Sequence, residues 1–223
     1  MVKLEHLRTL DVSQAGVLDA KNYDEFVEKV RKWGLEGGEA GSETYNDRVG
    51  AAFEVYTEFF FARYGTASNP LLGVTKITHT SQDPSQCGYD FNYDDLGGLP
   101  GHVQSKFRSN PMHLFSPTEL GTFVLMADGE GIPASRRILF TNLDHKPSDD
   151  GNGVFHRVFK HGRNQMRVIG RSQQEEFIDR DTSFWQDLLA SVLESAKPPS
   201  TGQAHKMRKH QLEVFEGILQ VMQ

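Results

Sequence analysis

The spacing of apolar residues predicts a first helix soon after the amino-terminal segment. Asn22 and Glu25 are spaced as the N-cap and the third helical residue of a capping box. We expect this helix to run to about Trp33 and to end at Gly34, because glycine commonly follows the last helical residue. Residues 35–42, LEGGEAGS, predict the loop that comes next.

A second helix is predicted to start at Asn46 or Asp47 and to end at Tyr64, with Gly65 as its stop. Its apolar residues recur every three or four positions, so they form one stripe along the helix. The stripe consists of Ala52, Val55, Tyr56, Phe59 and Phe60. This pattern predicts a helix that packs in the core.

From Val74 onward, alternation with a period of two replaces the helical spacing. The segments VTKITHT (74–80), YDFNY (89–93) and HVQSKF (102–107) predict three short antiparallel strands. The sequence DDLGGLPG between the second and third strands is typical of a turn, so these two strands are expected to form a hairpin.

The remaining sequence predicts further helices around this sheet. The expected elements are a helix capped by Ser116 or Thr118 that ends at Met126, a buried strand in RRILFTN, a short helix at 152–161, a strand at RVIG and an amphipathic helix at 182–195. The predicted fold class is α/β, with a mixed β-sheet flanked by helices and a core order of α-β-β-β-α-β.

The chain has 223 residues, which fits one medium domain with an appendage. We expect the domain at residues 1–196. The segment KPPSTGQ has the composition of a linker, which we place at 197–205. Residues 206–223 predict a carboxy-terminal helix.

Composition predicts a cytoplasmic protein. No apolar run approaches the roughly 18 residues that a membrane-spanning helix needs. The amino terminus, MVKLEHLRTL, lacks the apolar region and cleavage site of a signal peptide. Cys87 is the single cysteine, so an internal disulfide is excluded and a reducing compartment is indicated.

The net charge of −6 argues against a protein that binds nucleic acid over its whole surface. Charge is nevertheless polarised along the chain, since residues 154–171 contain five Lys or Arg, two His and no acid. One interpretation of this run is a solvated face. The other is a surface that contacts phosphates.

Candidate chemistry lies in the predicted hairpin. Strand alternation places Gln104 and Lys106 on one face, and Asp90 is expected beside them on the neighbouring strand, within reach of Glu54 on the core helix. Carboxylate and amide oxygens are ligands for Mg²⁺, or for Mn²⁺ in its place, and a lysine can orient or deprotonate an attacking water. The alternative is the wet face of a two-sided sheet.

Several segments together resemble the PD-(D/E)xK nuclease superfamily, in particular its Mrr-like restriction-endonuclease branch. They are GAAFEVYTEFFFARYG, CGYD, VQSKFRS, PTELGTFVLMA and ILFTN, within about residues 22–145. The resemblance implies a restriction-endonuclease-like core and a metal-dependent DNA endonuclease of a bacterial or phage-infected cell. It also implies that Glu54, Asp90 and Gln104 are metal ligands and that Lys106 is the catalytic lysine. The chain lacks the proline that names the superfamily.

Basic residues after the third strand are expected to hold the DNA backbone. They are Arg108, Arg157, Lys160, Arg163 and Arg167. A non-cleaving DNA-binding or docking module with a nuclease-like fold is the alternative function. The histidines at 79, 102, 113, 145, 156 and 161 are not spaced as metal ligands, so no structural zinc site is expected.

The segment MRKHQLEVFEGIL near the carboxy terminus is similar to the entry of a superfamily 2 helicase motor. Gln211 matches the glutamine that contacts adenine in that family. The similarity implies a helicase domain in the same full-length chain as a partner. No phosphate-binding GxxxxGK[ST] occurs in the sequence, so no ATPase activity is predicted for these residues. An ordinary terminal helix is the alternative.

Overall fold

The computed structural model describes residues 2, 4–6, 9–80, 88–111, 113, 115–143 and 166–196. They form a mixed α/β fold around a five-stranded sheet with the strand order β3-β4-β5-β6-β7. The strands are β3 (Val74–His79), β4 (Phe91–Asp95), β5 (Pro100–Lys106), β6 (Arg137–Thr141) and β7 (Arg167–Ile169). The pairs β3–β4 and β4–β5 are antiparallel, whereas β5–β6 and β6–β7 are parallel. The predicted mixed sheet is therefore confirmed.

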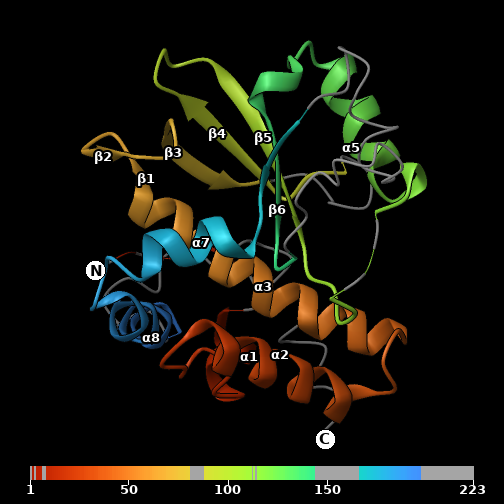
Figure 1. Cartoon of the computed structure of the whole chain (residues 1–223), viewed down its shortest axis with the longest axis vertical. Helices are drawn as coiled ribbons and strands as arrows, with labels where there is room; N and C mark the ends of the chain where they lie inside the picture. The colour runs from red at the N-terminus through yellow and green to blue at the C-terminus, as the bar shows by residue number, and fades with distance from the viewer. Residues whose placement is uncertain are drawn as a thin grey trace, which may run out of the picture.

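Helices pack against both faces of this sheet. The helices are α1 (Thr9–Gln14), α2 (Tyr23–Gly37), α3 (Glu43–Tyr64), α5 (Pro117–Gly129), α7 (Arg171–Ile178) and α8 (Phe184–Ser195), with a 3-10 turn, η1 (Ala134–Arg136). In Figure 1, α3 lies between the sheet and a further layer formed by α1, α2 and α8. Leu120 and Phe123 of α5 are buried in clusters with Leu139 and Tyr89, separate from the main core cluster. No described helix is both long and apolar enough to cross a bilayer.

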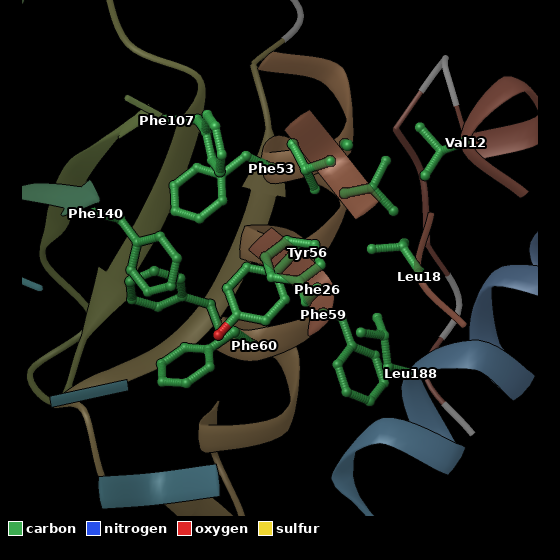
Figure 2. Packing of buried hydrophobic residues seen from close by; sticks show 14 of the residues in the cluster. Val12, Leu18, Phe26, Phe53, Tyr56, Phe59, Phe60, Phe107, Phe140 and Leu188 are labelled. Atoms are coloured by element: carbon green, nitrogen blue, oxygen red, sulfur yellow. The ribbon is translucent and has the colours of Figure 1, made fainter. Parts of the chain in front are cut away.

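Helix α3 is the centre of the main core. All five residues of the predicted stripe are buried, and the helix ends at Tyr64 as expected. The ring of Phe53 lies 5.7 Å from that of Phe107 and 5.5 Å from that of Phe140, measured between centroids, so the helix packs directly on β5 and β6 (Figure 2). The predicted start was wrong, because Ser42 caps the helix by accepting a hydrogen bond from the Tyr45 amide.

Helix α2 begins as predicted and ends later. The Asn22 side chain accepts a hydrogen bond from the Glu25 amide at 2.9 Å, while the Glu25 carboxylate accepts from the Lys21 amide instead of completing the capping box. Gly34 does not end the helix, which continues to Gly37. A Cβ atom at position 34 would lie 2.7 Å from side-chain atoms of both Tyr45 and Val49, so this glycine permits close packing of α2 on α3.

The hairpin between β4 and β5 is confirmed. Its turn is held by Asp95, whose Oδ1 accepts hydrogen bonds from the amides of Gly97 at 2.8 Å and Leu99 at 2.9 Å. Gly98 has a φ of 72°, which favours glycine at this position.

The later elements follow the prediction in part. Helix α5 is capped by Ser116, and its capping box includes Glu119; the strands β6 and β7 and the helix α8 are also present. The pattern did not predict α1 and α7. The expected helix at 152–161, the linker at 197–205 and the terminal helix at 206–223 lie outside the described residues.

Two glycine-to-alanine substitutions separate close packing from helix propensity. Gly34→Ala should lower the free energy of unfolding by about 1 kcal/mol, because overpacking against Tyr45 and Val49 outweighs the propensity gained. Gly121 is also inside a helix, but a Cβ atom there would meet no atom within 4 Å. Gly121→Ala should therefore raise the free energy of unfolding by up to about 1 kcal/mol. Urea unfolding of both variants measures the difference, and a stabilised Gly34→Ala protein would contradict this account of the packing.

Candidate functional site

Asp90 lies immediately before β4, where three strands meet. Its amide donates to the Val103 carbonyl and its own carbonyl accepts from the Thr80 amide, both at 2.9 Å. Its carboxylate Oδ2 accepts hydrogen bonds from Gln104 Nε2 and from the Ser105 amide, both at 2.6 Å. The structure thus brings Asp90 and Gln104 together across the hairpin, as the strand alternation predicts.

Glu54 and Lys106 line one cavity of about 690 Å³ between α3 and the end of β5. Lys106 is partly exposed and lies on the same face of β5 as Gln104, because the two residues are two positions apart. Ser105 points the other way, toward α3, where its hydroxyl lies 2.9 Å from that of Thr57. The cavity is further lined by Tyr45, Asn46, Val49, Gly50, Arg108 and His113, among others.

The charges around Asp90 are unbalanced. Burial of the Asp90 carboxylate and the negative charge of Glu54 raise its pKa from an ordinary 3.8 to about 7, against the opposing effect of Lys106. Each negative charge in this region therefore makes the next one more costly. The two carboxylates therefore act on each other through their charge, with Asp90 buried and Glu54 half-buried.

Glu54 also contacts two histidines that the sequence interpretation did not assign to the site. Its Oε2 lies 2.8 Å from His6 Nε2 and 4.0 Å from His79 Nε2. Burial would raise the pKa of Glu54, but the two histidines lower it to about 2. Burial would likewise lower the pKa of His79, but Glu54 and the Thr80 carbonyl raise it above its ordinary value. No local spacing relates His6, Glu54 and His79, which explains why the sequence pattern missed the cluster.

The side chains of the predicted site carry oxygen atoms of the kind that a hard divalent cation such as Mg²⁺ prefers. Glu54 and Asp90 supply two carboxylates, and Gln104 directs its Nε2 at Asp90, which leaves Oε1 as a neutral oxygen donor. The raised pKa of Asp90 indicates that negative charge at this place lacks full compensation, and a bound cation would supply it.

The predicted DNA contacts are only partly within the described residues. Arg108 lines the cavity but is paired with Glu119, with Nη2 and Oε1 2.7 Å apart. Burial raises the pKa of Glu119, but the Ser116 amide and Arg108 lower it to about 2, so this pair is charged. Arg167, the first residue of β7, donates a hydrogen bond to the Leu72 carbonyl. Arg157, Lys160 and Arg163 lie outside the described residues.

Comparison with known proteins adds no relative: no family model matches the chain, and no curated protein matches it. The candidate site is therefore judged by its own geometry.

The pKa of Asp90 predicts a pH-dependent cost to stability. Between about pH 4 and pH 7 the folded chain keeps a proton on Asp90 that the unfolded chain releases, so stability falls as the pH rises through this window. Asp90→Asn removes that cost. Since a tenfold change in acidity corresponds to about 1.4 kcal/mol, a shift from 3.8 to about 7 makes this variant more stable than the parent by up to about 4 kcal/mol at pH 8 and by little at pH 4.

Urea unfolding at the two pH values measures this difference. Asp94→Asn on the same strand is the matched control. Mg²⁺ should stabilise the parent at pH 8 more than it stabilises Asp90→Asn. If Asp90→Asn gains the same stability at both pH values, the raised pKa of Asp90 is contradicted. If Mg²⁺ stabilises the parent and Asp90→Asn equally, that result counts against a cation-binding role for Asp90.

Proposed function

We propose that this chain is a Mg²⁺-dependent DNA endonuclease that hydrolyses phosphodiester bonds. The observation that supports it most directly is the pairing of Asp90 with Gln104, with Lys106 two residues further along the same strand and the charge of Glu54 acting on Asp90. Two carboxylates, one on the hairpin and one on α3, together with an amide oxygen and a lysine of the hairpin, are the donor set that metal-assisted phosphodiester hydrolysis needs.

The order of the elements supports the same proposal. The helix α3 is followed by a separate sheet of two short strands, β1 (Gly65–Thr66) and β2 (Asn69–Pro70). The chain then forms β3, β4 and β5 of the main sheet, followed by α5 and β6. This is the order of helix, three strands, helix and strand expected for the restriction-endonuclease-like core of the Mrr-like branch. Glu54 lies on the first helix of that order, Asp90 at the start of its second strand, and Gln104 and Lys106 on its third strand.

Each side chain has a distinct role in this proposal. Glu54, Asp90 and Gln104 would hold Mg²⁺, which would polarise the phosphate and lower the pKa of a bound water. The Gln104 amide and the Ser105 backbone amide fix the orientation of the Asp90 carboxylate. Lys106, at the cavity wall, orients or deprotonates the attacking water and offsets the negative charge that develops on the phosphate.

The cavity between α3 and β5 is the proposed place for the DNA backbone. Arg108 lies in its wall, and a phosphate that enters would compete with Glu119 for the guanidinium group. The net charge of −6 limits nucleic-acid contact to such local groups. The proposed helicase domain of the same full-length chain would bring the nuclease to its substrate, and its predicted entry lies outside the described residues.

Substitution of the lysine and the aspartate tests the activity. Lys106→Ala and Asp90→Ala should each lower Mg²⁺-dependent nicking of supercoiled plasmid by at least about 100-fold, because each removes a group that acts on the reacting phosphate or its metal. Lys76→Ala is the matched control, since Lys76 is an exposed lysine on β3, and it should cleave like the parent. A chelator should stop cleavage by the parent.

Circular dichroism and thermal unfolding of each variant show whether its fold is kept. Undiminished cleavage by folded Lys106→Ala and Asp90→Ala would exclude the proposed site. Salt-sensitive binding of DNA without cleavage in Mg²⁺ or Mn²⁺ would favour the non-cleaving module instead. A parallel digest of single-stranded RNA shows whether the substrate is DNA or RNA.

A further inference from the structure

A cluster of two histidines and one carboxylate lies beside the oxygen-rich site. His6 comes from the amino-terminal segment, Glu54 from α3 and His79 from the end of β3. One ligand atom from each of the three side chains lies within 4.8 Å of the other two. The side chains of His6, Glu54 and His79 are 5%, 24% and 18% exposed, so the cluster is largely shielded from water.

His79 has the hydrogen-bonding pattern of a metal ligand. Its Nδ1 lies 3.0 Å from the Thr80 carbonyl oxygen, which can only accept, so Nδ1 carries the proton in this contact. In the neutral ring the lone pair is then on Nε2. That atom is buried and makes no hydrogen bond within the described part of the chain, and Glu54 Oε2 is 4.0 Å away. A buried nitrogen without a hydrogen-bond partner calls for an explanation, and a metal ion supplies one.

His6 is held in place by contacts outside its ring. Glu58, one helical turn beyond Glu54, accepts hydrogen bonds from the Glu5 amide at 2.6 Å and the His6 amide at 3.1 Å. The Thr9 hydroxyl donates to the His6 carbonyl at 2.7 Å. Glu54 and Glu58 therefore act on the same segment, Glu54 through the His6 ring and Glu58 through the backbone. This arrangement holds the His6 ring beside Glu54 before any ion binds.

We propose that His6, Glu54 and His79 form a second metal site, for a divalent transition-metal ion of the Zn²⁺ class. Two imidazole nitrogens and one carboxylate are the protein ligands of many catalytic zinc sites and leave further positions for water or substrate. Imidazole suits Zn²⁺ and its neighbours, whereas Mg²⁺ prefers oxygen. Two ligand atoms about 2 Å from a tetrahedral ion lie about 3.3 Å apart, so His79 Nε2 would move toward Glu54 Oε2 and His6 Nε2 slightly away from it. The site does not rest on the nuclease proposal, although Glu54 belongs to both.

Metal binding tests the site without any measurement of activity. The full chain, freed of metal by a chelator and dialysed, should bind one equivalent of Zn²⁺ in calorimetry, and Co²⁺ should give the visible absorption of a nitrogen-ligated ion. His79→Ala and His6→Ala should each weaken Zn²⁺ binding by at least about 10-fold. His113→Ala, which removes a partly exposed histidine paired with Glu119, should bind like the parent.

Further variants keep the outcome decisive. Thermal unfolding in the presence of chelator shows whether His6→Ala and His79→Ala fold, and His79→Gln offers a milder change at the same position. Zn²⁺ should raise the melting temperature of the parent but not of the His79 variants. Absence of stoichiometric Zn²⁺ binding, or binding that survives loss of either histidine, would overturn the proposal and leave a hydrogen-bonded ion-pair network in its place.

Lys106→Ala separates this proposal from the nuclease proposal. The variant should bind Zn²⁺ normally, because Lys106 is not a ligand of the histidine cluster, even where cleavage is lost. If the parent binds Zn²⁺ through the histidines but never cleaves nucleic acid, the metal site stands and the nuclease proposal fails. If the parent cleaves with Mg²⁺ but the histidine variants bind Zn²⁺ unchanged, the nuclease proposal stands and the metal site at His6, Glu54 and His79 fails.

Discussion

The burial of α3 is the constraint on which the rest of the structure depends. Its aromatic side chains pack against β5 and β6 on one side and against α2 and α8 on the other (Figure 2). Each fully buried aromatic residue contributes roughly 1.5–3 kcal/mol, so a rotation of this helix would forfeit much of the stability of the domain. Glu54 follows Phe53 directly, and its position is therefore fixed by core packing rather than by its own contacts.

This fixed carboxylate acts on both candidate sites. The negative charge of Glu54 raises the pKa of Asp90 by repelling its carboxylate. The same charge raises the pKa of His79 by attracting its protonated ring. The chain thus places two histidines beside the half-buried Glu54, whereas the charge of the buried Asp90 is not fully compensated. Such an arrangement costs stability above about pH 7, and costs of this kind are typical of sites that bind a cation or perform chemistry.

The sequence predicted those features that depend on local spacing. The end of α3 at Tyr64, the hairpin turn at Asp95 and the pairing of Asp90 with Gln104 all follow from periodicity and turn chemistry. Gly34 was misassigned because a glycine that permits helix packing has the same local pattern as one that ends a helix. His6 was missed for a different reason: its contact with Glu54 joins segments far apart in the chain, and only the tertiary fold brings them together.

The neutral side chain at position 104 follows from the same electrostatics. Asp90 is already raised to a pKa of about 7 by burial and by Glu54, so a glutamate in place of Gln104 would add a third buried negative charge beside it. Such a glutamate could not donate to Asp90 Oδ2 as Gln104 Nε2 does, unless it were itself protonated. In the proposed metal site, a glutamine would keep Asp90 oriented and still offer an oxygen to a cation. It achieves this with two negative charges instead of three, at the expense of a weaker hold on the ion.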